Sequence, residues 1–181
     1  MALPLLTVTW LKKNNVGVTV ISHNSESKTL VRGCHPRGCY IRDIKYAGAD
    51  LLQLGKLTAI SAHCEQFIKY DCYHSVIFEN GLMFGWWVSR DGNNMTYWGG
   101  SNATYTYKCA CGVNGTCANS NYGCNCDAND KRWREDSGLL TDKSHIPVKQ
   151  LRFGDNPDSS EYGYHTLGKL KCYGIKSNQT K

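Results

Sequence analysis

Alternating apolar and polar positions predict that most of this chain forms β-strands. Val16, Val18 and Val20 occupy every second position of one run, which is the period of a half-buried strand. The polar stretch 12–15 suits a turn, and the Asn- and Gly-rich stretch 90–94 suits a hairpin turn. The strands predicted in this way are 6–10, 16–22, 40–46, 67–78, 84–88, 147–152 and 167–173.

One helical pattern lies between residues 50 and 68. Apolar side chains recur there at an i, i+3 spacing, and Gly55 predicts a break in the helix. Residues 154–164 are polar and are predicted to form a loop. Because no repeat or low-complexity linker divides the chain, we expect one domain over residues 1–174 and a polar tail over 175–181.

Composition fits a secreted, loop-rich β protein better than a helical bundle. Aromatic residues make up 11% of the chain, charged residues 20%, and the net charge is +6. The basic residues are scattered and accompany no nucleic-acid-binding motif, so a nucleic-acid partner is not expected. No window approaches the roughly 20 apolar residues of a membrane span. The apolar run after Met1 is shorter than a signal-peptide core, so we interpret the chain as mature or trimmed.

The segment 109–126 holds five of the ten cysteines, among Gly and Asn residues that offer little apolar surface to bury. Such a segment needs disulfides or a metal to hold its shape. Zinc ligands are usually separated by two to four residues, whereas these cysteines include Cys-x-Cys pairs. N-glycosylation acceptor sequences begin at Asn94, Asn102, Asn114 and Asn178. We therefore expect a disulfide-bonded glycoprotein from an oxidising compartment.

Cys34 and Cys39 flank a short turn that contains Pro36 and Gly38. A local disulfide across this turn is one interpretation. A bond to a second subunit is the other, because both thiols lie at the end of a loop.

Several motifs carry a family resemblance. They are His63-Cys64-Glu65-Gln66 with Tyr70 and Cys72, Trp86-Trp87-Val88, Tyr97-Trp98-Gly99-Gly100-Ser101, Lys108-Cys109-Ala110-Cys111-Gly112, Cys124-Asn125-Cys126-Asp127-Ala128, Trp133-Arg134, Gly154-Asp155, and Leu170 with Cys172. From about Thr9 to Gly174 the chain resembles the fibrinogen-like segment of the contactin-associated proteins, which are neurexin-like adhesion receptors. A fainter similarity extends to the C-propeptides of fibrillar collagens.

The resemblance implies an extracellular α+β fold of the fibrinogen-like class, with a central, mostly antiparallel sheet and long disulfide-tied loops. It also implies eight framework cysteines: Cys64, Cys72, Cys109, Cys111, Cys117, Cys124, Cys126 and Cys172. By analogy with the collagen propeptides, Cys72 is expected to pair with Cys172. Cys34 and Cys39 depart from the family pattern.

No catalytic motif stands out, and the six histidines are scattered, so an enzyme is not expected. Two groups of oxygen-bearing side chains suit calcium instead, because this ion takes six to eight oxygen ligands. The first group includes Asp127, Asn129 and Asp136. Its alternative interpretation is a charged face whose acids pair with neighbouring Lys and Arg side chains.

The second group consists of Asp155, Asn156, Asp158 and Glu161. Its Asn-Pro-Asp tripeptide is similar to one with which C-type lectins hold calcium and sugar, although these residues are also ordinary turn formers. The side chains predicted to contact a sugar are Tyr162, Tyr164, His165 and Trp98.

The sequence therefore favours a secreted, calcium-dependent lectin for terminal sugars of the galactose type on glycoproteins or glycolipids. Agglutination by such a protein needs at least two sites, so a homodimer is expected. The alternative is an extracellular protein-adhesion module without a sugar site.

Overall fold

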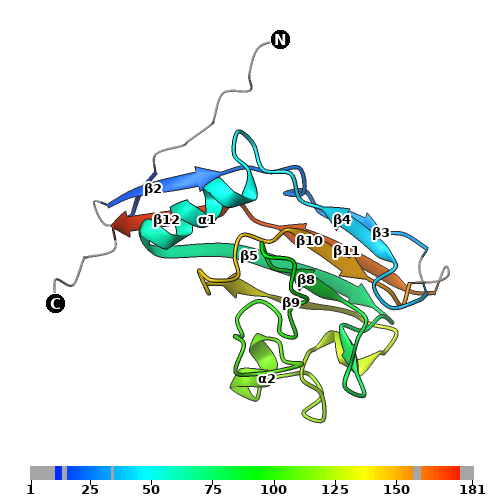
Figure 1. The fold of residues 1–181 in the computed structure, drawn as a ribbon. Helices are drawn as coiled ribbons and strands as arrows, with labels where there is room; N and C mark the ends of the chain where they lie inside the picture. The colour runs from blue at the N-terminus through cyan, green and yellow to red at the C-terminus, as the bar shows by residue number, and fades with distance from the viewer. Residues whose placement is uncertain (1–10, 14–15, 34, 157–159, 176–181) are drawn as a thin grey trace.

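The computed structural model describes residues 11–13, 16–33, 35–156 and 160–175. A seven-stranded sheet with the order β1-β2-β12-β5-β11-β3 dominates the fold, and β9 also pairs with β5 (Figure 1). Every pairing in it is antiparallel. Its strands are β1 (Leu11–Lys13), β2 (Val16–Ile21), β3 (Thr29–Val31), β5 (Ser61–Tyr73), β9 (Trp133–Leu140), β11 (Tyr162–Leu167) and β12 (Leu170–Ile175).

Strand β5 organises this sheet because its thirteen residues are long enough to pair with three partners. Its first half pairs with β12, its second half pairs with β11, and its other edge pairs with β9. Alternate side chains from Cys64 to Cys72 are buried, as the two-residue period of a strand requires. The opposite face of this strand carries Lys69, Asp71 and Tyr73.

A smaller sheet with the order β4-β10-β8 packs its apolar side chains into the same core. Its strands are β4 (Tyr40–Asp43), β10 (Gln150–Phe153) and β8 (Trp86–Val88), and β6 (Phe78–Glu79) pairs separately with β7 (Leu82–Met83). Phe153 joins the two layers. Its ring stacks 4.5 Å from the Tyr70 ring on β5 and 5.8 Å from the His165 ring on β11.

Helix α1 (Leu51–Ile60) packs against β5 and β12, and it differs from the predicted helix in two respects. It runs through Gly55 without a break, and it ends at Ser61, where β5 begins. Asp50 and Gln53 form a capping box that fixes its start. Beyond residue 60 the i, i+3 spacing wrongly predicted a helix. The long-range pairs with β12 and β9 impose strand geometry there.

The predicted strands at 16–22, 40–46, 84–88, 147–152 and 167–173 are confirmed with shifted ends, and β5 begins six residues before the predicted 67–78. The prediction at 6–10 lies outside the described residues. The hairpin turn at 90–94 is confirmed, since Val88 bridges Asn94. Strands β1, β3, β7 and β9 were missed, and β1 falls partly in the predicted turn 12–15. The predicted loop 154–164 overlaps the start of β11.

Four disulfides join described residues to each other. Cys64–Cys172 links β5 to β12, Cys72–Cys126 links β5 to the cysteine-rich segment, and Cys109–Cys124 and Cys111–Cys117 lie within that segment. All eight predicted framework cysteines therefore form disulfides. The predicted pairing of Cys72 with Cys172 is wrong, because the β5–β12 register places Cys172 opposite Cys64. Cys39 is disulfide-bonded, but Cys34 lies outside the described residues, so neither interpretation of this cysteine pair is tested.

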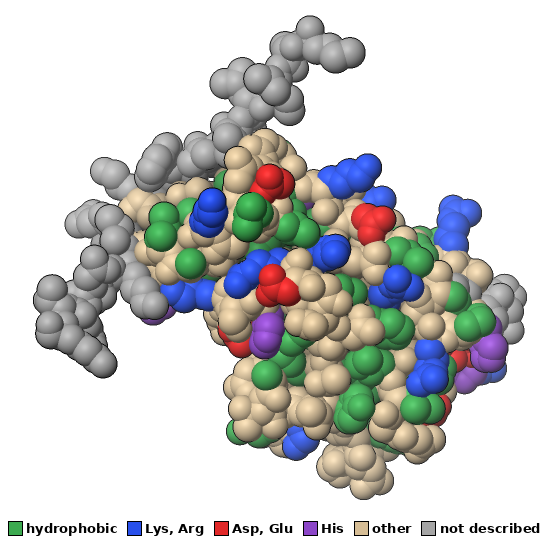
Figure 2. Space-filling model, in the orientation of Figure 1, with side chains coloured by type: hydrophobic (Ala, Val, Ile, Leu, Met, Phe, Trp, Pro, Cys, Tyr) green, Lys and Arg blue, Asp and Glu red, His purple; other side chains and the backbone are tan. Residues whose placement is uncertain are grey.

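The antiparallel sheet and the disulfide-tied loops are as expected, whereas helix is scarcer than an α+β class suggests. Besides α1, the described chain has α2 (Ala110–Asn114) and the 3-10 turn η1 (Cys126–Ala128). A relation to the fibrinogen-like fold stays a prediction. None of the described helices has the length and apolar character needed to cross a membrane. Lys and Arg side chains are scattered over the face seen in Figure 2.

Candidate functional site

Three aromatic side chains form a row across the outer face of the large sheet. Tyr162 on β11 lies directly opposite Tyr73 on β5, and Tyr73 lies directly opposite Trp133 on β9. Tyr164, two residues further along β11, has its ring centroid 5.8 Å from that of Trp133. We call these four residues the aromatic cluster.

The aromatic cluster is open to solvent. Trp133 is 55% exposed and Tyr162 is 37% exposed, which is unusual for such large apolar side chains. The Trp133 and Tyr162 rings lie 6.3 Å apart and are inclined by 35°. Tyr73 lies between them in the sheet. The Trp133 and Tyr162 rings, which belong to different strands, therefore border one shallow depression.

This depression is a pocket of about 240 Å³ lined by Tyr73, Lys131, Trp133, Ser160 and Tyr162. Three aromatic side chains, two of them phenols, line it together with the Ser160 hydroxyl and the Lys131 ammonium group. Aromatic walls with a few convergent polar groups are the usual composition of a small-ligand site.

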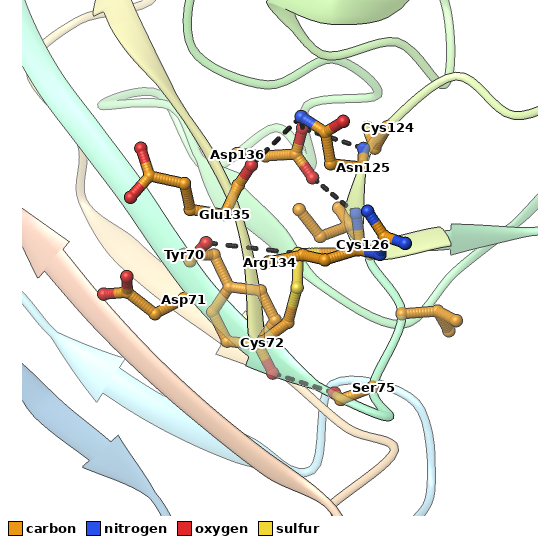
Figure 3. The surroundings of a disulfide bond; sticks show 12 residues. Tyr70, Asp71, Cys72, Ser75, Cys124, Asn125, Cys126, Arg134, Glu135 and Asp136 are labelled. Carbon is orange, nitrogen blue, oxygen red and sulfur yellow. Dashed lines mark hydrogen bonds between the residues drawn. A yellow bond between two sulfur atoms is a disulfide. The ribbon is translucent and has the colours of Figure 1, made fainter. Parts of the chain in front are cut away.

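Charged side chains continue from the aromatic cluster along the same sheet face. Asp71 accepts ion pairs from Lys28 at 3.1 Å and from Lys69 at 3.0 Å, and Lys69 also pairs with Glu135. The Lys28 ammonium lies 4.8 Å from the centre of the Tyr164 ring, within cation–π range. Figure 3 shows Asp71 and Glu135 pointing away from the Cys72–Cys126 disulfide. Their carboxylates therefore face the side of the sheet that carries the aromatic cluster.

The first predicted calcium group does not converge on one exposed point. Asp127 is buried, and its Oδ1 accepts the backbone N–H groups of Ile77 and Phe78. Burial raises its pKa to about 7. Asn129 is exposed and ends the turn η1 with a left-handed backbone.

Asp136 is also buried, and both of its carboxylate oxygens accept backbone N–H groups, from Asn125 and Cys126 (Figure 3). Burial raises its pKa to about 6. One oxygen of Asp136 lies close to the sulfurs of Cys109 and Cys124. These two sulfurs are bonded to each other, so they offer no thiolate to a metal. Both aspartates of this group hold the cysteine-rich segment to the sheet.

The second predicted calcium group is divided between core and surface. Asp155 Oδ2 accepts the backbone N–H of Val76. Asn156 is 2% exposed, and its Nδ2 donates to the Tyr70 hydroxyl, the Ser75 hydroxyl and the Gly154 carbonyl. The Glu161 carboxylate lies 3.9 Å from His74 Nδ1, and Asp158 lies outside the described residues.

Calcium does not fit either group as the described residues lie. Three of the aspartates, Asp127, Asp136 and Asp155, already accept backbone N–H groups, and the Asn156 side chain is buried among hydroxyls. A calcium ion needs six to eight oxygens directed at one point.

Two of the residues predicted to contact sugar lie in the core instead. Trp98 and His165 are completely buried. The Trp98 indole N–H donates to the Asp136 carbonyl, and His165 Nε2 bonds to the Tyr40 hydroxyl. Burial lowers the pKa of His165 to about 4, so this imidazole is neutral at physiological pH. The prediction for these two residues is corrected, because side chains that pack the core cannot reach a ligand on the surface.

The structure places Tyr162 and Tyr164 on the exposed sheet face, as the prediction requires, and adds Tyr73 and Trp133 to them. No local pattern in the sequence links the members of the added pair. Tyr73 lies 60 positions before Trp133, and only the β5–β9 register makes them neighbours.

Comparison with known proteins shows a clear relationship over most of the chain. It is 34% identical over 168 residues to human contactin-associated protein 1, which covers 92% of this chain and 12% of that protein. It is 36% identical over 165 residues to neurexin-4 of Drosophila melanogaster, which covers 87% of this chain and 13% of that protein. This chain is homologous to one segment of those proteins.

The rat contactin-associated protein 1 gives the same identity as the human protein. The chain thus spans about one eighth of the length of the curated relatives it matches. No protein-family model matches the chain. The homology confirms the resemblance to the contactin-associated proteins, and the four disulfides fit an extracellular, oxidising compartment.

Proposed function

We propose that this protein is a secreted, non-enzymatic carbohydrate-binding protein and that the aromatic cluster is its sugar site. The single observation that carries the proposal is the exposed row Tyr162–Tyr73–Trp133 across three strands. The C–H faces of a hexose pack well against aromatic rings. A rigid sheet holds these rings in place before the ligand arrives, which lowers the entropy cost of binding.

Terminal sugars of the galactose type are our first choice of ligand. In galactose one face of the ring carries several C–H groups without an intervening hydroxyl, and this face suits the Trp133 indole. Ser160 and Lys131 border the same pocket and can bond to the hydroxyls at its rim. The rings provide most of the contact area, and the two polar groups orient the sugar.

The sequence predicted calcium-dependent binding, but the proposed contact with the sugar does not need calcium. The sugar would touch aromatic rings, a hydroxyl and an ammonium group, none of which is a good calcium ligand. A homodimer is retained in the proposal, since two linked sites would allow the protein to bridge two cells.

The homology supports a second candidate function, a protein-adhesion module without a sugar site. Its supporting observation is the 34–36% identity to contactin-associated protein 1 and neurexin-4. In that case the exposed aromatic cluster would contact a partner protein, since aromatic residues are enriched in such interfaces.

Titration calorimetry with methyl β-galactoside, with and without EDTA, distinguishes these possibilities. We expect saturable binding that EDTA leaves unchanged, together with red-cell agglutination that free galactose inhibits. Loss of binding in EDTA would show that sugar binding depends on calcium after all. Absence of binding to galactosides and to every sugar on a glycan array would favour the adhesion module.

A further inference from the structure

Among the residues that the structure describes, the charges beside the aromatic cluster do not balance. Three lysines, Lys28, Lys69 and Lys131, lie along this face with two carboxylates, Asp71 and Glu135. Lys28 and Lys69 share Asp71, and Lys69 also contacts Glu135. These two lysines and two carboxylates form a connected network in which the charges cancel. One of the three ammonium groups is not part of this network.

That ammonium group belongs to Lys131. It lines the pocket between Trp133 and Tyr162, and within the described part of the chain it forms no ion pair. Its neighbour in sequence, Asp130, is already engaged by Arg134, with contacts of 2.8 Å to Nε and 2.6 Å to Nη2. This ion pair with Arg134 lowers the pKa of Asp130.

We infer that the sugar carries a negative charge, such as a uronate carboxylate or a sulfate, and that Lys131 binds this group. This inference rests on the proposed function, because it specifies the ligand of the same pocket. Trp133 and Tyr162 accept the apolar face of the sugar ring, and Lys131 lies at the rim where a substituent of that ring projects. The aromatic walls favour a sugar over a simple inorganic anion, which would leave the rings uncovered.

The location of the network strengthens this assignment. Asp71 is 9% exposed and already pairs with two lysines, so its charge is largely compensated. Glu135 pairs with Lys69 and lies opposite Asp71, two residues along β5 from Tyr73, and it does not line the pocket. An anionic ligand at the pocket would therefore meet Lys131 before either carboxylate.

The test compares methyl galactoside with methyl galacturonate, two sugars that differ only at C6. We expect the wild-type protein to bind the galacturonate about two- to fivefold more tightly, within the range of an exposed ion pair. Lys131→Gln should abolish this preference, because it weakens galacturonate binding more than galactoside binding. Lys56→Gln, an exposed lysine on α1, is the matched control and should keep the preference. Raising the salt concentration should reduce the preference in the wild type.

The outcomes separate this inference from the proposed function. Equal affinity for both sugars, or a preference that survives in Lys131→Gln, overturns the role of Lys131 while galactoside binding continues to support the sugar site. Failure of the wild-type protein to bind either sugar removes both proposals. Binding of sulfated galactose with the same dependence on Lys131 supports the broader anionic class.

Discussion

Trp133 lies directly opposite Tyr73 in the β5–β9 pair, and the centroids of their rings are 5.5 Å apart. Both side chains project from the outer face of the sheet, away from the core that holds Tyr70 and Cys72. Cross-strand aromatic pairs stabilise a sheet by less than about 1 kcal/mol. Exposing an indole to water in this position is thus poorly explained by stability alone, and a ligand explains it better.

Replacing Trp133 with Ala should weaken galactoside binding at least tenfold, because it removes one wall of the pocket. The free energy of unfolding should fall by no more than about 1 kcal/mol, since the side chain is 55% exposed. Calorimetry and urea denaturation measure the two effects. Tyr105→Ala, which removes a comparably exposed aromatic outside the cluster, should change neither quantity appreciably. A Trp133→Ala variant with wild-type affinity would remove the proposed site.

Disulfide mapping should find Cys64 joined to Cys172 and Cys72 joined to Cys126. Trypsin cleaves after Lys69, so it separates Cys64 from Cys72 and gives distinct cross-linked peptides. Mass spectrometry under non-reducing conditions identifies each pair. Recovery of Cys72 linked to Cys172 would contradict the register of β5 with β12.

Two glycines should respond in opposite directions to replacement by Ala. Gly55→Ala should stabilise the protein by about 0.5–1 kcal/mol, because Ala favours a helix and the new methyl group meets no atom closer than 3.4 Å. Gly138→Ala should destabilise it by about 1–3 kcal/mol, because its methyl group would lie 2.4 Å from the backbone nitrogen of Gly100. Urea denaturation of both variants checks these signs, and a neutral Gly138→Ala would argue against the close approach of β9 to the 99–100 turn.

Asp127→Asn should alter how stability depends on pH. Burial raises the pKa of Asp127 from 3.8 to about 7, so between these values the folded protein binds a proton that the unfolded chain releases. The contribution of Asp127 to stability is therefore present at low pH and is lost as the pH rises toward 7, by up to about 1.4 kcal/mol per pH unit. An Asn side chain can still accept hydrogen bonds from the backbone N–H groups of Ile77 and Phe78, but it does not titrate.

The measurement is the difference in unfolding free energy between wild type and Asp127→Asn at pH 4.5, 5.5 and 6.5. The lowered pKa of His165 gives the opposite trend between about 4 and 6.5, with stability lost as the pH falls, but both proteins share it. Asp136 helps to raise the pKa of Asp127 by charge repulsion, so removing the Asp127 charge should lower the pKa of Asp136 and reinforce the same difference. The wild type should therefore lose stability relative to the variant as the pH rises. A difference that stays constant with pH would show that Asp127 is ionised throughout.

The sequence by itself determined the β-rich character and the positions of several strands, and the family resemblance supplied the set of framework cysteines. Short-range periodicity is sufficient for a strand such as β2, because alternate side chains must face alternate sides. Cysteine density in a segment without apolar residues likewise requires cross-links. The two tyrosines of the proposed site, Tyr162 and Tyr164, were also predicted from local sequence.

Only the tertiary structure decided which distant residues meet. The register between β5 and β12 pairs Cys64 with Cys172, and the register between β5 and β9 places Trp133 beside Tyr73. Packing against Phe153 helps to bury both His165 and Trp98, which the sequence analysis had placed at the surface. Strand register depends on the summed burial and hydrogen bonding of segments far apart in the chain, so no local pattern encodes it.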